Sequence, residues 1–236
     1  MTIEEFSNEF DILLNSSIAA KKFGEGQTIY ELDEYEKSVL LTQAQETIVR
    51  LLYDSSQSGV GFEGNEKARR SLDNLVKTAK LSPIATPVIP GVNNESQFFQ
   101  LPNDVWYITY ESALMSDESL GCKNNTYVEV IPVRQDEYHI VKDNPFRGPT
   151  KSRVLRIDTG DFIIELISKY NIGTYFIKYL SKPKPIILED IDDDNLSIEG
   201  EKKKQGCELN SLLHRTILEG AVSLAMNRIP SQKNNV

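Results

Sequence analysis

Residues 82–110 read SPIATPVIPGVNNESQFFQLPNDVWYITY, and this stretch decides how the chain is organised. Its first half contains three prolines and then a glycine, a composition that disfavours helix and predicts an extended connector. Its second half is rich in aromatic and β-branched residues, which are typical of strands. We therefore expect two differently built parts, one on each side of this stretch.

The part that precedes the connector is predicted to be helical. Thr2 with Glu5, and Asp33 with Glu36, have the spacing of capping boxes, and Asn65 can cap a third helix. Apolar residues follow each start at three- and four-residue steps and predict the buried faces. They are Ile3, Phe6, Phe10, Leu13 and Leu14; Leu40, Leu41, Ala44, Ile48, Leu51 and Leu52; and Ala68, Leu72, Leu75, Val76 and Ala79.

The part that follows the connector has the pattern of a sheet. Short runs of apolar and β-branched residues are separated by turn signals, and 158–161 are predicted to form a hairpin turn. The runs are 97–101, 104–110, 126–133, 153–158, 162–167, 173–180 and 185–188. A last helix is expected from about Asn210 to Asn227, with Leu212, Leu213 and Ile217 on its apolar face.

These patterns together predict an α+β fold with a central antiparallel, sandwich- or barrel-like body. The expected parts are a helical portion at 1–82, a proline-rich connector at 83–96, a β-rich body at 97–206 and a C-terminal helix at 207–229.

Composition excludes several classes of protein. Lys and Arg number 26 against 35 Asp and Glu, which gives a net charge of −9 and argues against general nucleic-acid binding. No apolar run approaches the roughly 20 residues of a membrane span. Two cysteines, Cys122 and Cys207, are too few for a disulfide scaffold, and two histidines are too few for a multi-histidine metal site. We expect no cofactor.

One acidic segment resembles a calcium-binding loop in its spacing. Asp190, Asp192 and Asp194, with Glu201 eleven residues after the first, follow the order of calcium ligands. The sixth position is Asn195 in place of glycine, and Pro183 and Pro185 upstream exclude an entering helix. The alternative interpretation is a solvated acidic hairpin, and a calcium-dependent binding module remains the rival function.

No pattern of catalytic residues is visible. His139 and His214 each lack a nucleophile-elbow motif nearby, and a hydrolase would need the fold to bring a carboxylate pair or a His-centred dyad together. We predict that the chain is not an enzyme, and a hydrolase is the less favoured alternative.

Charge order suggests a contact between subunits. The acidic run Glu189, Asp190, Asp192, Asp193 and Asp194 is followed by the lysine run Lys202, Lys203 and Lys204. Opposite patches on identical subunits can meet through a head-to-tail interface. A second expected contact is an exposed edge near Phe98, Phe99 and Trp106.

Several segments resemble a known family of proteins. They are ELDEYEK at 31–37, QDEYH at 135–139, NPFRGP at 144–149, ISKYNIGTYFIKYLSKPKPIIL at 167–188 and CELNSLLHRTILEGAV at 207–222. Together they resemble the ring-forming structural proteins of the head-to-tail region of crAss-like bacteriophages. The end of the chain is also similar to podovirus adaptor and tail-tube proteins.

This resemblance implies a virion protein made in the host cytoplasm, without catalytic residues. It implies a closed ring, commonly of twelve subunits, between the portal and the tail, with the portal and adjacent ring proteins as partners. Encapsidated DNA would pass through the lumen without specific binding, and the acidic composition agrees because carboxylates repel phosphate.

Overall fold

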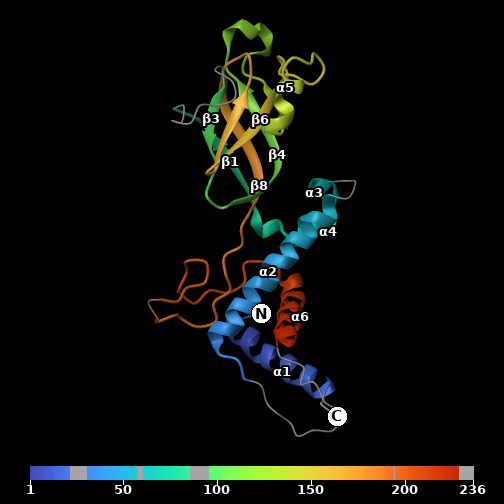
Figure 1. Cartoon of the computed structure of the whole chain (residues 1–236), viewed down its shortest axis with the longest axis vertical. Coiled ribbons are helices and arrows are strands. Elements are labelled where there is room, and N and C mark those ends of the chain that lie inside the picture. The colour runs from blue at the N-terminus through green and yellow to red at the C-terminus, as the bar shows by residue number, and fades with distance from the viewer. Residues whose placement is uncertain (22–30, 58–60, 86–95, 194, 229–236) are drawn as a thin grey trace. The chain divides into compact units, whose positions relative to one another are not determined.

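The computed structural model describes residues 1–21, 31–57, 61–85, 96–193 and 195–228 (Figure 1). The chain divides into two compact units. A helical unit contains Met1–Leu75 and Pro183–Val236, and a β unit contains Val76–Lys182. The β unit is therefore an insertion, which the chain enters after Leu75 and leaves after Lys182. The α+β class predicted from the sequence is confirmed.

The helical unit is built from α1 (Ile3–Lys21), α2 (Glu34–Gln57), α3 (Gly61–Gly64), α4 (Glu66–Ser71), the 3-10 helix η1 (Asp73–Leu75) and α6 (Ser211–Arg228). Both predicted capping boxes form. The Thr2 and Glu5 side chains each accept a hydrogen bond from the other residue's backbone amide, and Asp33 and Glu36 do the same. Local sequence therefore fixes the start of both long helices.

The core of the helical unit lies where α6 packs on α1 and α2. On α1 every fourth residue is buried, from Phe6 through Phe10 and Leu14 to Ile18. On α6 the fully buried positions are Ile217, Leu218 and Ala221. At Gly220 a Cβ would meet the Cβ of Ala44 on α2 at 3.5 Å, an ordinary van der Waals distance. Two small residues therefore face each other where α2 and α6 pack.

The β unit contains one curled sheet of eight strands in the order β1-β8-β4-β5-β6-β7-β3-β2. The strands are β1 (Val76–Leu81), β2 (Pro83–Ile84), β3 (Gln97–Gln100), β4 (Val105–Met115), β5 (Tyr127–Pro132), β6 (Arg153–Gly160), β7 (Ile163–Ile167) and β8 (Ile172–Ser181). A 3-10 helix, η2 (Glu118–Lys123), and a short helix, α5 (Gln135–Val141), complete the unit. The main core contains Phe99, Met115, Val154 and Tyr175.

The sheet is mixed, although the sequence predicted an antiparallel one. All neighbouring strands are antiparallel except β5 and β6, which run parallel. Parallel neighbours need a crossover connection, and residues 133–152 with α5 provide it. The predicted hairpin between β6 and β7 forms, with its turn at Asp161 and Phe162, both of which have positive φ angles.

Two predictions for individual elements are wrong. The helix expected to continue past Val76 ends at Ser71, and residues 76–81 form β1, because their backbone pairs with β8. Residues 185–188 were expected to be a strand of the β-rich body. They belong to the helical unit instead, where side chains of α2 bind their backbone and only Ile187 makes a β-bridge, to Gln205. Of the expected connector, residues 86–95 lie outside the described part of the chain.

Candidate assembly surface

Neither histidine of the sequence has a catalytic environment. His139 is exposed on α5. His214 is buried, and its two ring nitrogens contact the N-terminal ammonium of Met1 at 2.9 Å and the carbonyl oxygen of Leu209 at 3.0 Å. Burial, together with the nearby ammonium charge, lowers the pKa of His214. The two histidines lie in different units, and the contacts of His214 connect α6 to the start of the chain.

A buried group of charged and polar side chains lies inside the β unit, and Arg156 also pairs with the Asp158 carboxylate there at 3.3 Å. The Glu111 carboxylate accepts hydrogen bonds from Arg156 at 3.0 Å and from the Tyr175 hydroxyl at 2.6 Å. Burial raises the pKa of Glu111 and of Tyr175. Glu111 thus has both a counterion and a hydroxyl donor in the core, and we interpret the network as structural.

The acidic and lysine runs lie side by side in one hairpin. This segment, here called the acidic hairpin (187–193 and 195–205), is closed by a bridge between Ile187 and Gln205 and by another between Ile198 and Glu201. The Ile191 amide donates to the Lys202 carbonyl oxygen at 2.8 Å, and the Lys204 amide donates to Asp190 at 2.5 Å. The two runs therefore already contact each other within a single chain.

The charged groups of the hairpin remain available to other molecules. Glu189, Asp190, Asp192 and Asp193 are exposed, as are Lys203 and Lys204. Lys202 directs its ammonium to the carbonyl oxygen of Asp193 at 3.1 Å. Leu196 exposes 39% of its surface among these charges.

The calcium prediction depends on Asp194, which lies outside the described residues. Among the residues that are described, no three carboxylate, histidine or cysteine side chains are grouped to hold a metal ion. Asp190 is engaged with the backbone of Lys204. No observation here favours the calcium-dependent module.

The predicted exposed edge near Phe98 and Phe99 is wrong. Phe98 and Phe99 expose 3% and 0% of their surface, because β3 lies between β7 and β2 in the sheet. Trp106 is half-buried and stacks on Tyr107 with ring centroids 5.2 Å apart. A contact between subunits through the two phenylalanines would require the sheet to open.

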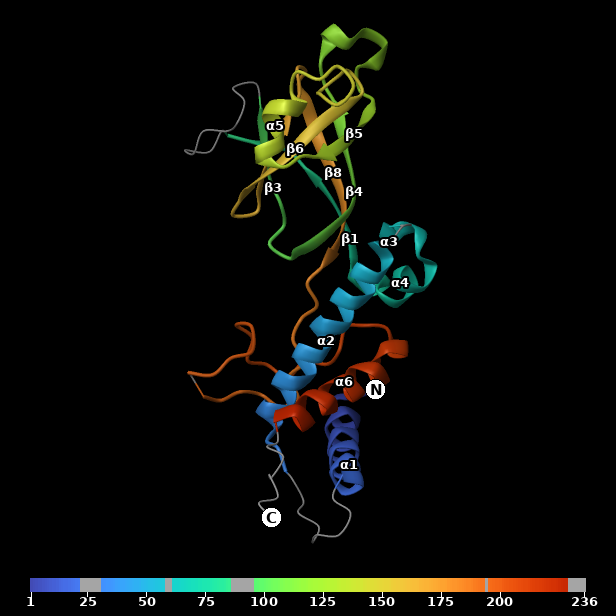
Figure 2. The same cartoon turned by 45° about the vertical axis from the view of Figure 1, so that its right-hand side comes forward.

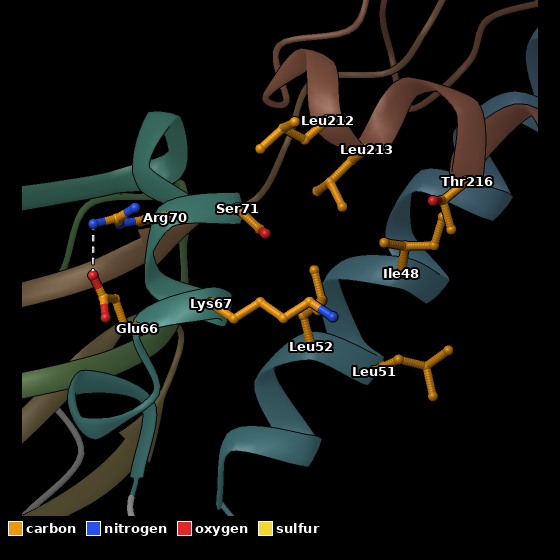
Figure 3. Close-up of a pocket in the computed structure, with 10 residues that line it drawn as sticks. All are labelled: Ile48, Leu51, Leu52, Glu66, Lys67, Arg70, Ser71, Leu212, Leu213 and Thr216. Carbon is orange, nitrogen blue, oxygen red and sulfur yellow. Dashed lines mark ion pairs between the residues drawn. The ribbon is translucent and has the colours of Figure 1, made fainter.

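An apolar groove opens on the helical unit instead, between α2, α4 and the first turns of α6 (Figure 3). Its volume is about 810 Å³. The apolar lining consists of Ile48, Leu51, Leu52, Leu212 and Leu213. Leu51 and Leu212 expose 63% and 74% of their surface, although both belong to the apolar stripes predicted to be buried. The periodicity of the sequence identified these leucines and could not indicate that the fold leaves them uncovered.

Basic side chains from α4 border this groove. Figure 3 shows Lys67 extended across the opening toward Leu52, with its ammonium next to α2. Arg70 pairs with Glu66 at 2.6 Å, and both side chains remain largely exposed. Lys67 makes no ion pair with any residue in the described part of the chain. The groove therefore combines exposed leucines with a cation that has no ion-pair partner among the described residues.

No helix in the described ranges is long and apolar enough to span a membrane.

Comparison with known proteins gives matches along nearly the whole chain. A family model described as phage tail ring protein 3/4 matches residues 1–235. "Ring protein 3" of Bacteroides phage crAss001 is 47% identical over 228 residues, which cover 96% of this chain and 95% of the relative. "Ring protein 4/5" of the same phage is 31% identical over 235 residues, covering 95% of this chain and 92% of the relative.

Proposed function

Because the chain belongs to the phage tail ring protein 3/4 family, we propose that it is a ring-forming subunit of the head-to-tail connector, which links the portal to the tail. The observation that carries this proposal is the family match over residues 1–235, together with 47% identity to a ring protein of crAss001. The resemblance inferred from the sequence is confirmed by the same match. The role is architectural, in the virion, and uses no catalytic residue.

The ring is proposed to be a homo-oligomer of twelve subunits that contacts the portal and adjacent ring proteins. Exposed leucines in the apolar groove and exposed charges on the acidic hairpin support such assembly, since uncovered apolar surface and complementary charge are typical of protein interfaces. The acidic hairpin, with Glu189 to Asp193 and Lys202 to Lys204, is one proposed contact between subunits.

The proposed passage of DNA follows from the charge of the chain. A ring with a net charge of −9 on each subunit repels the phosphate backbone wherever its carboxylates face the lumen. DNA would then slide through the ring during ejection without being held. This predicts that assembled rings do not retard double-stranded DNA in a gel at physiological salt.

The experiment that tests the function is native mass spectrometry of the purified chain, alone and mixed with the other ring and portal proteins of its virion. The expected result is a closed oligomer whose mass is a multiple of 26.7 kDa and whose ring shape is visible by negative-stain electron microscopy. A chain that stays monomeric with every virion component would contradict the proposal.

A further inference from the structure

We propose that the acidic hairpin of one copy of the chain binds in the apolar groove of the next copy, forming a head-to-tail contact between identical subunits. This inference rests on the proposed ring function and specifies which surfaces meet. The entering segment is the first half of the hairpin, with Ile191 and Leu196 among its carboxylates.

The groove has the character of a surface that is covered in an assembly. Leu51 and Leu212 lie mostly exposed on its two sides, from α2 and from α6, and the groove between them is large enough to take several side chains. Single exposed leucines are common on protein surfaces, whereas several leucines that line one groove mark an interaction site. A hairpin that carries Ile191 and Leu196 would remove this apolar surface from water.

Charge complementarity selects the occupant. Lys67 holds its ammonium over the groove without an ion-pair partner among the described residues, whereas Arg70 points away from the opening in Figure 3 and pairs with Glu66. The hairpin supplies the opposite charge from Glu189, Asp190, Asp192 and Asp193, all exposed. Its lysines lie on the returning strand, where Lys202 pairs with Ile191 through the backbone and directs its ammonium to the Asp193 carbonyl oxygen. The two surfaces thus match in both apolar and charged character.

The placement of the two surfaces on the helical unit favours a ring over a pair. In Figures 1 and 2 the hairpin projects from one side of α2, while α4 and the first turns of α6 lie on the other side. A hairpin therefore cannot reach the groove of its own chain without crossing α2. Two different complementary surfaces on opposite sides of one unit produce a heterologous contact, which repeats from copy to copy and closes into a ring when the rotation allows.

The test uses two charge-reversal variants of the full chain. The hairpin variant carries Asp192→Lys and Asp193→Lys, and the groove variant carries Lys67→Glu and Arg70→Glu. In each variant alone the hairpin and groove have the same sign, so the concentration needed for ring assembly should rise about tenfold or more. In an equimolar mixture every contact between unlike variants is complementary again, and rings of alternating subunits should form near the wild-type concentration.

A third variant, Glu118→Lys with Glu129→Lys, is the matched control, because it reverses two exposed acidic charges in the β unit. It should assemble like the wild type. Rescue in the mixture also demonstrates that both variants are folded, and far-ultraviolet circular dichroism checks each one separately.

The inference is overturned if either variant assembles like the wild type, or if the mixture assembles no better than its components. The wild-type chain would still form rings in either case, and the proposed function would stand. Failure of the wild-type chain to form rings with any virion component would instead overturn both.

Discussion

The side-chain hydroxyl of Thr42 on α2 makes hydrogen bonds with both backbone groups of Ile186. It accepts from the Ile186 amide at 3.0 Å and donates to the Ile186 carbonyl oxygen at 3.3 Å. One turn earlier, Ser38 accepts from the Leu188 amide at 2.9 Å, and one turn later Gln45 donates to the Lys184 carbonyl oxygen at 2.8 Å. A polar stripe on one helix thereby takes the place of a partner strand for residues 184–188.

Replacing Thr42 by valine should destabilise the helical unit by about 1–3 kcal/mol, because the buried amide and carbonyl of Ile186 then lose their partner. Valine keeps the shape of threonine, so the loss reports the hydrogen bonds. The measurement is urea unfolding followed by circular dichroism at 222 nm, which reports the helices.

Thr47→Val is the matched control on the same helix. Thr47 is exposed, and its hydroxyl bonds only the carbonyl oxygen of Gln43, one turn back. Its replacement should change the free energy of unfolding by no more than about 0.5 kcal/mol. Equal effects of the two substitutions would show that the Thr42 contacts do not stabilise the fold.

Local signals in the sequence predicted the parts of the fold that depend on neighbouring residues. The capping boxes at Thr2 and Asp33 were correct because each is a contact between residues three apart. The helix expected across Val76 was wrong because residues 76–81 pair with a strand about a hundred positions later. Apolar spacing alone cannot show whether such a segment will pair with a strand far away in the sequence.

The groove could not be predicted from the sequence, because it too depends on contacts between distant parts of the chain. Leu51 and Leu212 were identified as apolar, yet their exposure depends on how α2, α4 and α6 pack. Likewise, the pairing of Asp190 with Lys204 within one hairpin requires the chain to turn between them. The order of charges predicted a contact between the two runs in different subunits, whereas the fold brings them together in one hairpin through hydrogen bonds that involve the backbone.

Replacing Arg156 by methionine should destabilise the β unit by about 3–5 kcal/mol, because it leaves the Glu111 carboxylate buried without its counterion. Alternation along β6 directs Arg156 to the same face as Val154, so the charge lies at the main core. The side chains of Arg156 and Glu111 expose only 12% and 11% of their surface. Fluorescence of Trp106, the single tryptophan, reports the unfolding of this unit.

The double variant Arg156→Met with Glu111→Gln should recover part of the loss, since no charge is then left buried. A lower pH should also stabilise the Arg156→Met variant. Burial raises the pKa of Glu111, so the folded chain takes up this proton before the unfolded chain does, and stability rises as the pH falls from 7 toward 5. A single variant as stable as the wild type, at every pH, would contradict the role given to the pair.

Stability of the helical unit should fall as the pH drops below about 6.5, owing to His214. Burial and the Met1 ammonium lower the pKa of His214 in the folded chain, so on acidification the unfolded chain binds this proton first. The full stability of the helical unit is present above pH 7, where His214 is neutral in both states. It is lost as the pH falls through 6.5 and below, because only the unfolded chain readily takes up the proton. Melting temperatures followed at 222 nm between pH 7.5 and 5.5 measure it.

Variants of the two histidines separate this effect from general acid sensitivity. His214→Gln should lower the melting temperature at pH 7.5 and flatten its dependence on pH across this window. His139→Gln, at an exposed position on α5, should keep the wild-type dependence. If His214→Gln leaves the dependence of the melting temperature on pH unchanged, another group causes the loss of stability in acid.

The two thiols should react at very different rates. Cys122 is exposed, whereas Cys207 is half-buried and donates a hydrogen bond to the Gln45 side-chain oxygen at 3.2 Å. Burial raises the pKa of Cys207 to about 11, so only a small fraction of this group is the reactive thiolate at pH 8. With Ellman's reagent at pH 8, one thiol per chain should react rapidly and the second only after urea unfolds the helical unit. Cys122→Ser should abolish the rapid phase and keep the slow one. Rapid reaction of Cys207 in that variant would contradict this prediction and would mean that the segment around residue 207 separates readily from α2.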